Sequence, residues 1–342
     1  MMRLHARIWV RTSPRTWMLS LGLVLAAWGS AASAQEVHRY RFAYDQPRGS
    51  GFAVAGDVFA AKLSELSKAT MIIDQFPGAQ LGQEPQILQL IKSGDVDFAV
   101  TSSANTATLS PQAGAMSLHF LFRSQDHLVK ALADPQVARE VHDMIEETVQ
   151  GAHVLALATL GLRSMYGKKE IHKVEDLKGL KVRVQATPTE DITFPAYGAQ
   201  TVHMPFGSVY TSLQTGVVDM AENGINVYLL NKHYEVAPVL SITEHEANNS
   251  LVWVSDKLWQ SLSAEQRQWV QAAGEEVAKV EPTKALELEK ASQAKLQSIG
   301  VKVVTDVDKS GFAKLSAPYV EQLATGLGPH AVKLVKLIQA VQ

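Results

Sequence analysis

The sequence predicts an α/β protein of two lobes with a hinged cleft between them. Strands and helices alternate over residues 38–103, and they alternate again over 178–224. Such alternation is typical of right-handed crossovers and of a mainly parallel sheet. The chain has 342 residues, more than one hydrophobic core usually supports. Together these observations favour two lobes built on one plan.

The first alternating segment is predicted to contain three strands and two helices. HRYRFAYDQ alternates apolar and polar residues, as a half-buried strand does. The second predicted helix opens with a proline and ends at Gly94, which suits its first turn and its C-terminal cap. The predicted strands are 38–46, 71–77 and 96–103, and the helices are 52–70 and 85–94.

The second segment repeats this order of elements. Its predicted strands are 178–185, 201–206 and 217–224, and its helices are 187–200 and 208–216. SGDVDFA (93–99) and TGVVDMA (215–221) share Gly, Val, Asp and Ala in register. In both places a helix end is predicted to run into a strand. The match indicates an internal repeat of one structural unit.

The C-terminal third is predicted to be mostly helical. A charged, Ala-rich stretch over 263–300 contains Pro282, so either two helices meet there or one long helix kinks. A short strand (301–307) and an amphipathic helix (330–342) follow. We expect the first lobe to contain 35–160 plus about 246–285. We expect the second to contain 161–245 plus about 286–342, with the C-terminal helices.

Residues 1–34 are predicted to be a cleaved signal peptide. Four arginines precede the apolar run WMLSLGLVLAAW (17–28), and small residues at 32–34 predict cleavage after Ala34. Without this segment, 28 basic residues face 34 acidic ones, a net charge of −6. A mildly acidic exported protein is a poor nucleic-acid binder. The chain has no cysteine, which excludes disulfides and thiolate metal sites.

Arg183 is the first candidate for a binding role. In KGLKVRVQ (178–185), Leu180, Val182 and Val184 alternate with Lys181, Arg183 and Gln185. Arg183 is either a solvated charge on the strand or an anion receptor aimed into the cleft. Clefts of α/β proteins bind ligands at the carboxyl ends of strands, and a guanidinium holds a carboxylate by two parallel hydrogen bonds.

Three segments together resemble the substrate-binding proteins of tripartite ATP-independent periplasmic (TRAP) transporters, of the dicarboxylate type. They are EDLKGLKVRVQATPTEDITFPAYGAQTVHMPFGSVYTSLQTGVVDMAENG (175–224), FPGAQLGQEPQILQLIKSGDVDF (76–98) and NKHYEVAPVLSITEH (231–245). The resemblance implies a periplasmic-binding-protein-like fold with a long helix spanning both lobes. It implies capture of an organic acid for a two-part membrane permease driven by an ion gradient.

The resemblance also implies roles for four residues. Arg183 corresponds to the arginine that pairs with the ligand carboxylate, and Arg163 to a second cation that often lines the site. Asn223 corresponds to an asparagine that contacts the carboxylate, and Phe206 to the aromatic residue packed over the ligand. The chain departs from the family pattern beyond Glu84, in the ENGIN sequence after Ala221, and at Pro282.

Position along the chain adds four weaker candidates. Ser103 lies in TSSANTATLS (101–110), whose hydroxyls and Asn105 follow a strand end and suit a polar ligand. Tyr44 and Asp45 lie at the end of the first predicted strand, and Glu84 lies at the start of a predicted helix. The alternative to a ligand role is a structural one: Ser103 would begin a helix, and the negative charge of Glu84 would interact favourably with the helix dipole.

We expect no metal and no cofactor, because adjacent residues such as Glu244, His245 and Glu246 do not face one ion on a regular strand. No catalytic or nucleotide-binding motif is found. The expected ligand is a hydroxy, keto, aromatic or sugar acid, bound by a monomer in the periplasm. A dicarboxylate would need a second cation, for which Arg163 is the candidate. Two alternatives stay open: a partner of a periplasmic sensor, and an exported enzyme acting on a small acid.

Overall fold

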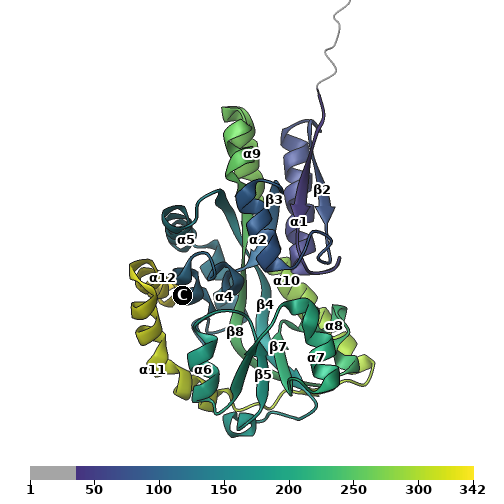
Figure 1. The fold of residues 1–342 in the computed structure, drawn as a ribbon, viewed down its shortest axis with the longest axis vertical. Helices are drawn as coiled ribbons and strands as arrows, with labels where there is room; N and C mark the ends of the chain where they lie inside the picture. The colour runs from purple at the N-terminus through teal and green to yellow at the C-terminus, as the bar shows by residue number, and fades with distance from the viewer. Residues whose placement is uncertain (1–35) are drawn as a thin grey trace, which may run out of the picture. The chain divides into compact units, whose positions relative to one another are not determined.

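A mixed sheet of nine strands organises the protein (Figure 1). The computed structural model describes residues 36–342, so the predicted signal peptide lies outside the described residues. Residues 37–342 form one compact unit. Eight strands follow the order β2-β1-β3-β8-β4-β7-β5-β6, and β9 pairs with β8. Within residues 36–342, no helix is long and apolar enough to cross a membrane.

The two ends of the sheet have the same topology, which confirms the predicted repeat. At one end β1 lies between β2 and β3, and at the other β5 lies between β6 and β7, with all these pairs parallel. The first-lobe elements are β1 (His38–Ala43), α1 (Gly51–Leu66), β2 (Met71–Phe76), α2 (Glu84–Ser93) and β3 (Phe98–Ser102). The second-lobe elements are β5 (Lys181–Val184), α6 (Glu190–Ala196), β6 (Gln200–His203), α7 (Val209–Thr215) and β7 (Met220–Asn223).

The repeated sequence motif has the same structural role in both lobes. Gly94 and Gly216 end α2 and α7 in the left-handed region, at φ 73° and 76°, where glycine has no steric cost. Asp97 accepts a hydrogen bond from a backbone amide of β1 at 2.7 Å, and Asp219 accepts one from a backbone amide of β5 at 2.8 Å. The motif therefore stabilises the fold of each lobe.

Two long antiparallel strands connect the lobes. β4 (Ala152–Gly167) and β8 (Val239–Ser255) pair with each other, β8 also pairs with β3, and β4 also pairs with β7. The predicted mainly parallel sheet is therefore wrong at its centre. Both strands are buried along almost their whole length, so the alternation that reveals a half-buried strand is absent. The short β9 (Lys302–Val304) adds to β8 in parallel.

One helix, α10 (Ala264–Ser298), continues through Pro282. It contacts α1 and β4 as well as α8 (Ile225–Leu230) and β9, so it spans both lobes as predicted. Its first turn has a capping box: Ser263 accepts from the amide of Gln266, and the Gln266 side chain accepts from the amide of Ser263. Glutamine serves here in place of the acid that such a box often has.

The C-terminal helices are not confined to the second lobe. α12 (Pro329–Ala340) packs on α5 (Pro135–Thr148) and on the 3-10 helix η1 (Pro111–Ser117). Leu334 and Ile338 lie in one apolar cluster with Ile87 and Leu88 of α2. This corrects the predicted placement of α12, since its apolar face completes the core of the first lobe. The other lobe boundaries stay a prediction.

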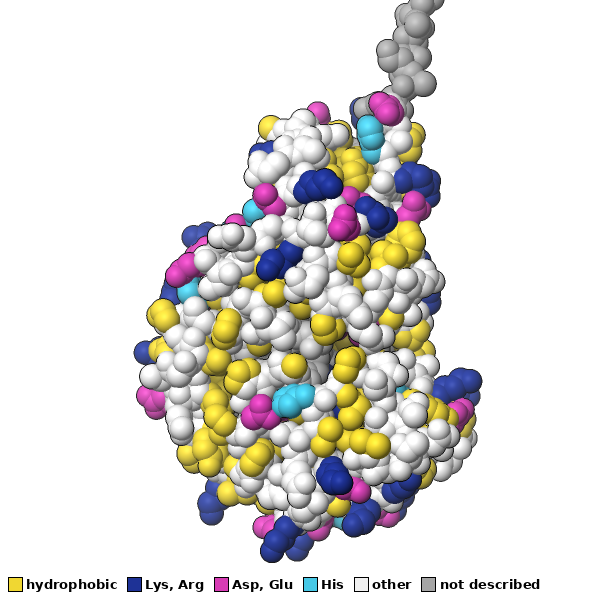
Figure 2. Space-filling model, in the orientation of Figure 1, with side chains coloured by type: hydrophobic (Ala, Val, Ile, Leu, Met, Phe, Trp, Pro, Cys, Tyr) yellow, Lys and Arg dark blue, Asp and Glu magenta, His cyan; other side chains and the backbone are white. Residues whose placement is uncertain are grey.

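The remaining helices are short or lie at the edges. α11 (Lys309–Leu327) contacts both η1 and α6. The others are α3 (Ser103–Thr106), α4 (Gln125–Ala133), η2 (Val174–Leu177), η3 (Phe206–Ser208), η4 (His233–Glu235) and α9 (Asp256–Ser261). Figure 2 shows one face of the molecule, with a narrow hollow near its middle and charged side chains of both signs mainly toward the rim.

Candidate functional site

A cavity of about 190 Å³ lies where the carboxyl ends of strands from both lobes meet. The first lobe contributes residues after β1 and β3, and the second contributes residues from β5 and after β6. Ligands of open α/β sheets bind at such positions. The lining residues are Asp45, Glu84, Pro85, Asn105, Arg183, Ala186, His203, Met204, Pro205 and Phe206.

Arg183 is fixed in this cavity by the backbone of the next strand. Its Nε and Nη2 donate to the carbonyl oxygen of Met204, at 3.2 Å and 2.9 Å. The residue is only 2% exposed, and its guanidinium carbon lies 5.9 Å from the centre of the Phe206 ring. Burial lowers the pKa of Arg183, but an arginine stays protonated in a protein. No hydrogen bond of Nη1 to residues 36–342 is found, which leaves this part of the guanidinium for an anion.

Glu84 organises the first-lobe side of the cavity. Its Oε2 accepts three hydrogen bonds: from the amide of Ser102 at 2.9 Å, from the hydroxyl of Ser102 at 2.5 Å and from Nδ2 of Asn105 at 2.7 Å. Asp45 lies close by and accepts from Gln46 at 3.0 Å. Burial, and then the nearby charge of Glu84, raises the pKa of Asp45 well above its ordinary value. This side of the cavity therefore carries carboxyl groups rather than cations.

The cleft is closed by hydrogen bonds between the lobes. Nε2 of Gln185 donates to the hydroxyl of Ser102 at 2.9 Å. The amide of Gly207 donates to Oε1 of Gln83, also at 2.9 Å. In both pairs, the first-lobe residue directly precedes a helix, and the second-lobe residue follows a strand. Closure of this kind surrounds a bound ligand with protein.

Arg163 lies in a separate buried ionic cluster and not in the cavity lining. It is 1% exposed and forms a two-pronged ion pair with the carboxylate of Glu222, with Nη2 2.6 Å from Oε1. Glu246 lies 3.4 Å from its Nε. Burial alone lowers the pKa of Arg163, but attraction to Glu222 and Glu246 outweighs burial and raises it. This placement corrects the prediction that Arg163 faces a ligand.

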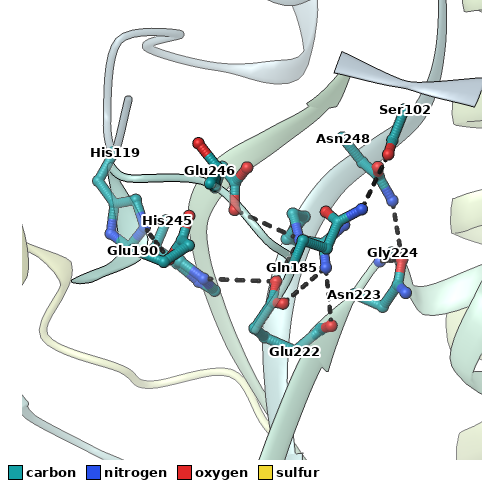
Figure 3. Close-up of polar contacts among 12 residues, drawn as sticks. Ser102, His119, Gln185, Glu190, Glu222, Asn223, Gly224, His245, Glu246 and Asn248 are labelled. Carbon is teal, nitrogen blue, oxygen red and sulfur yellow. Dashed lines mark hydrogen bonds and ion pairs between the residues drawn. The ribbon is translucent and has the colours of Figure 1, made fainter. Parts of the chain in front are cut away.

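Three other predicted residues also lie outside the lining. Oδ1 of Asn223 accepts from Nδ2 of Asn248 at 2.8 Å, as Figure 3 shows. Tyr44 packs in the apolar core and donates its hydroxyl to Gln75 at 2.8 Å. Ser103 is buried at the first position of α3. The neighbouring Ser102 makes the polar contacts expected from this loop.

Four predicted residues meet in the cavity, and sequence reasoning missed others. Arg183, Phe206, Glu84 and Asp45 all line it. His203 was missed: its Nε2 contacts Asp191 at 2.7 Å, and its Nδ1 contacts the Gln185 carbonyl at 2.8 Å. The available signal was a polar residue on the predicted strand 201–206, and the observed β6 ends at this histidine.

A two-lobe α/β fold that closes on a cavity containing a buried arginine is that of a binding protein for small anions. The family described as bacterial extracellular solute-binding protein, family 7, matches residues 44–326. The chain belongs to this family, and the TRAP resemblance seen in the sequence is confirmed. The family is one of solute-binding proteins rather than enzymes, and it is extracytoplasmic.

Relatives of known ligand support this assignment. The chain is 29% identical to the 2,3-diketo-L-gulonate-binding periplasmic protein YiaO of Escherichia coli K12, over 96% of this chain and 98% of that protein. A TRAP periplasmic solute-binding protein from Pseudomonas putida F1, solved with D-glucuronate, is 30% identical, with a TM-score of 0.83 over 89% of this chain and 98% of that one. One from Xanthobacter autotrophicus Py2, solved with β-D-galacturonate, is 30% identical, with a TM-score of 0.82 over 89% and 100%. The predicted two-lobe fold is confirmed by these structures.

Proposed function

We propose that this protein captures a sugar acid, holds its carboxylate on Arg183 and delivers it to a TRAP-type permease. The observation that carries the proposal is the orientation of Arg183. Two of its nitrogens are held by the Met204 carbonyl, and the guanidinium is buried at the cavity. A buried guanidinium needs an anionic partner to offset its desolvation. A neutral ligand would leave Arg183 uncompensated, so the site selects acids.

The rest of the lining favours a ligand with hydroxyl groups over an aromatic acid. Asp45, Glu84, Asn105 and His203 place polar side chains around the cavity. These groups accept or donate hydrogen bonds to the hydroxyls of a sugar, and Phe206 supplies an apolar face for its C–H groups. A dicarboxylate is disfavoured, because Asp45 and Glu84 lie where its second carboxylate would need a cation.

A thermal-shift screen of the mature protein tests the ligand class. The acids are D-glucuronate, D-galacturonate and 2,3-diketo-L-gulonate, and the neutral controls are D-glucose and D-galactose. We expect at least one acid to raise the melting temperature and neither neutral sugar to do so. Equal shifts with acids and neutral sugars would overturn the role of Arg183. Shifts with none of these acids, but with benzoylformate, would replace a sugar acid by an aromatic one.

Three further features belong to the proposal. Export with cleavage after Ala34 is supported by the basic and apolar pattern of residues 1–34, and N-terminal sequencing of periplasmic protein tests it. One ligand per monomeric chain is supported by one cavity that uses both lobes. Release of the ligand unchanged, as expected of a protein that is not an enzyme, is tested by NMR of the recovered acid.

A further inference from the structure

Four buried side chains outside the cavity lining gather at one place between the lobes. Figure 3 shows His119, Glu190, His245 and Glu246 together on one side of the view. Each is at most 4% exposed. His119 lies in the loop after η1, Glu190 opens α6, and the other two lie on β8. One potential ligand atom each of His119, His245 and Glu246 lies within 4.8 Å of the other two.

Both histidines are oriented with Nε2 toward this cluster. Nδ1 of His119 lies 2.9 Å from the hydroxyl of Tyr197, and Nδ1 of His245 lies 2.8 Å from that of Thr243. A histidine whose Nδ1 donates to an oxygen keeps a lone pair on Nε2, which is how metal-binding histidines are usually fixed. Nε2 of His119 faces Oε2 of Glu190 at 3.3 Å. In the tautomer whose Nδ1 donates to Tyr197, two acceptors meet there, and a cation between them would satisfy both.

Two atoms of the cluster are buried and lack a partner among the described residues. They are Nε2 of His245 and Oε1 of Glu190. An unsatisfied buried polar atom is energetically unfavourable, and two in one cluster indicate a missing common partner. The nearest carboxylate oxygen to this nitrogen, from Glu222, is 3.9 Å away, too far for a hydrogen bond.

The cluster also contains more carboxylates than cationic side chains. Three buried carboxylates, from Glu190, Glu222 and Glu246, surround one guanidinium, from Arg163. If all are ionised, two negative charges remain uncompensated. One divalent ion compensates the same charge as two added protons.

We propose that His119, His245 and Glu246, with Glu190 as the fourth ligand, bind a divalent transition-metal ion such as Zn²⁺. Two nitrogens and two carboxylate oxygens are a donor set that Zn²⁺ accepts in tetrahedral geometry. Tetrahedral ligands at about 2.0–2.1 Å from an ion lie roughly 3.3 Å apart. The separation of His119 Nε2 and Glu190 Oε2 is 3.3 Å. The ligand atoms of His119, His245 and Glu246 lie within 4.8 Å of one another, so binding requires them to close by up to about 1.5 Å.

A bulge in β8 explains why two consecutive residues serve one site. Pairing with β4 runs from Met165 with Ser241 directly to Arg163 with Glu246, so four residues of β8 face a single residue of β4. Glu244 within this bulge has φ 44°, in the left-handed region. The bulge rotates the chain and brings His245 and Glu246 to the same cluster. The expectation that adjacent residues of a strand cannot share an ion therefore does not apply here.

The position of the site gives the ion a structural consequence. It would join the segment after η1, which packs in the first lobe, to α6 of the second lobe and to β8, which crosses both. A bound ion would hold this side of the hinge together while the cavity at Arg183 opens and closes. This site does not depend on which acid the cavity binds.

Calorimetric titration of chelator-treated mature protein with zinc chloride tests the site. We expect one Zn²⁺ per chain, and a Kd at least 100-fold weaker in His245→Gln and in Glu246→Gln. The matched control is His142→Gln, whose side chain is 51% exposed and which should bind as the wild type does. Absence of zinc binding to the wild type, or wild-type affinity in the two cluster variants, would overturn the proposal.

Cobalt substitution tests the site in the wild-type protein, so its result does not depend on whether a variant folds. Co²⁺ in a tetrahedral site absorbs visible light far more strongly than octahedral Co²⁺. We expect the strong tetrahedral bands in the wild-type protein, and their loss on addition of one equivalent of Zn²⁺. A weak octahedral spectrum, or one that zinc does not displace, would place the metal at an adventitious surface position and overturn the assignment.

Discussion

Arg183 donates two hydrogen bonds to the carbonyl oxygen of Met204, and this contact sets the direction of its guanidinium. Arg183 lies on β5 and Met204 directly follows β6, so two neighbouring parallel strands fix the group. Because a backbone carbonyl holds it, the arginine is in place before a ligand arrives. Such preorganisation reduces the entropy lost on binding.

Replacement of Arg163 by methionine should lower the free energy of unfolding. Its effect on the affinity for the acid should be smaller. Glu222 would lose its partner in a fully buried setting, and breaking a buried pair costs about 3–5 kcal/mol. Urea denaturation monitored by circular dichroism measures the change. The exposed Arg139→Met is the control and should stay within about 0.5 kcal/mol. A stable Arg163→Met variant that no longer binds acids would return Arg163 to a ligand role.

Replacement of Gln83 by alanine should weaken ligand binding modestly. Its side chain accepts the Gly207 amide across the closed cleft, and one such hydrogen bond contributes about 0.5–1.5 kcal/mol. We expect a two- to tenfold weaker affinity, mainly from faster dissociation, as measured by stopped-flow fluorescence. Gln80→Ala, at an exposed position nearby, should have no effect. Unchanged dissociation in Gln83→Ala would mean that this contact does not contribute to closure.

The docking of α12 should depend on pH through His330. Its Nδ1 lies 2.7 Å from Glu140 and its Nε2 lies 2.7 Å from Glu147. The hydrogen bond to Glu147 is the largest influence, and it and the Glu140 bond raise the pKa of His330 above 6.5. Protonation is thus favoured by folding, so the stabilisation is complete below about pH 6.5 and disappears as pH rises through the folded-state pKa.

The free energy of unfolding of the wild type and of His330→Gln, compared at pH 5.5 and 8.5, measures this dependence. We expect the variant to lose about 1 kcal/mol at pH 5.5, a figure reduced for solvent screening, and much less at pH 8.5. Lys333, which also pairs with Glu140, stays charged at both values. An equal loss at the two values would show that His330 contributes by packing and not by its charge.

Local patterns were sufficient to predict the repeated strand–helix unit of each lobe but not the connection between the lobes. The alternation of apolar and polar residues gave the strands around Arg183, and Gly94 and Gly216 marked the helix ends. β4 and β8 escaped prediction because burial on both faces removes that alternation. The position of α12 was not predicted because the elements it packs against lie far from it in the sequence.

The candidate site shows the same division. The end of a strand predicted Asp45, the start of a helix predicted Glu84, and an alternating strand together with the family resemblance predicted Arg183. All three line the cavity. The sequence did not reveal that Glu222 and Glu246 lie beside Arg163, because these three residues come from three different strands. A buried arginine can bind a ligand carboxylate only if no buried acid of the protein already forms an ion pair with it.

Calorimetric binding of D-glucuronate, or of whichever screened acid gives the largest thermal shift, to Arg183→Met tests the central claim most directly. Lys181→Met, at the exposed first position of the same strand, is the matched control. We expect the control to bind like the wild type, and Arg183→Met to lose about 2–5 kcal/mol of binding free energy with an unchanged circular dichroism spectrum. Wild-type affinity in a folded Arg183→Met protein would contradict the account.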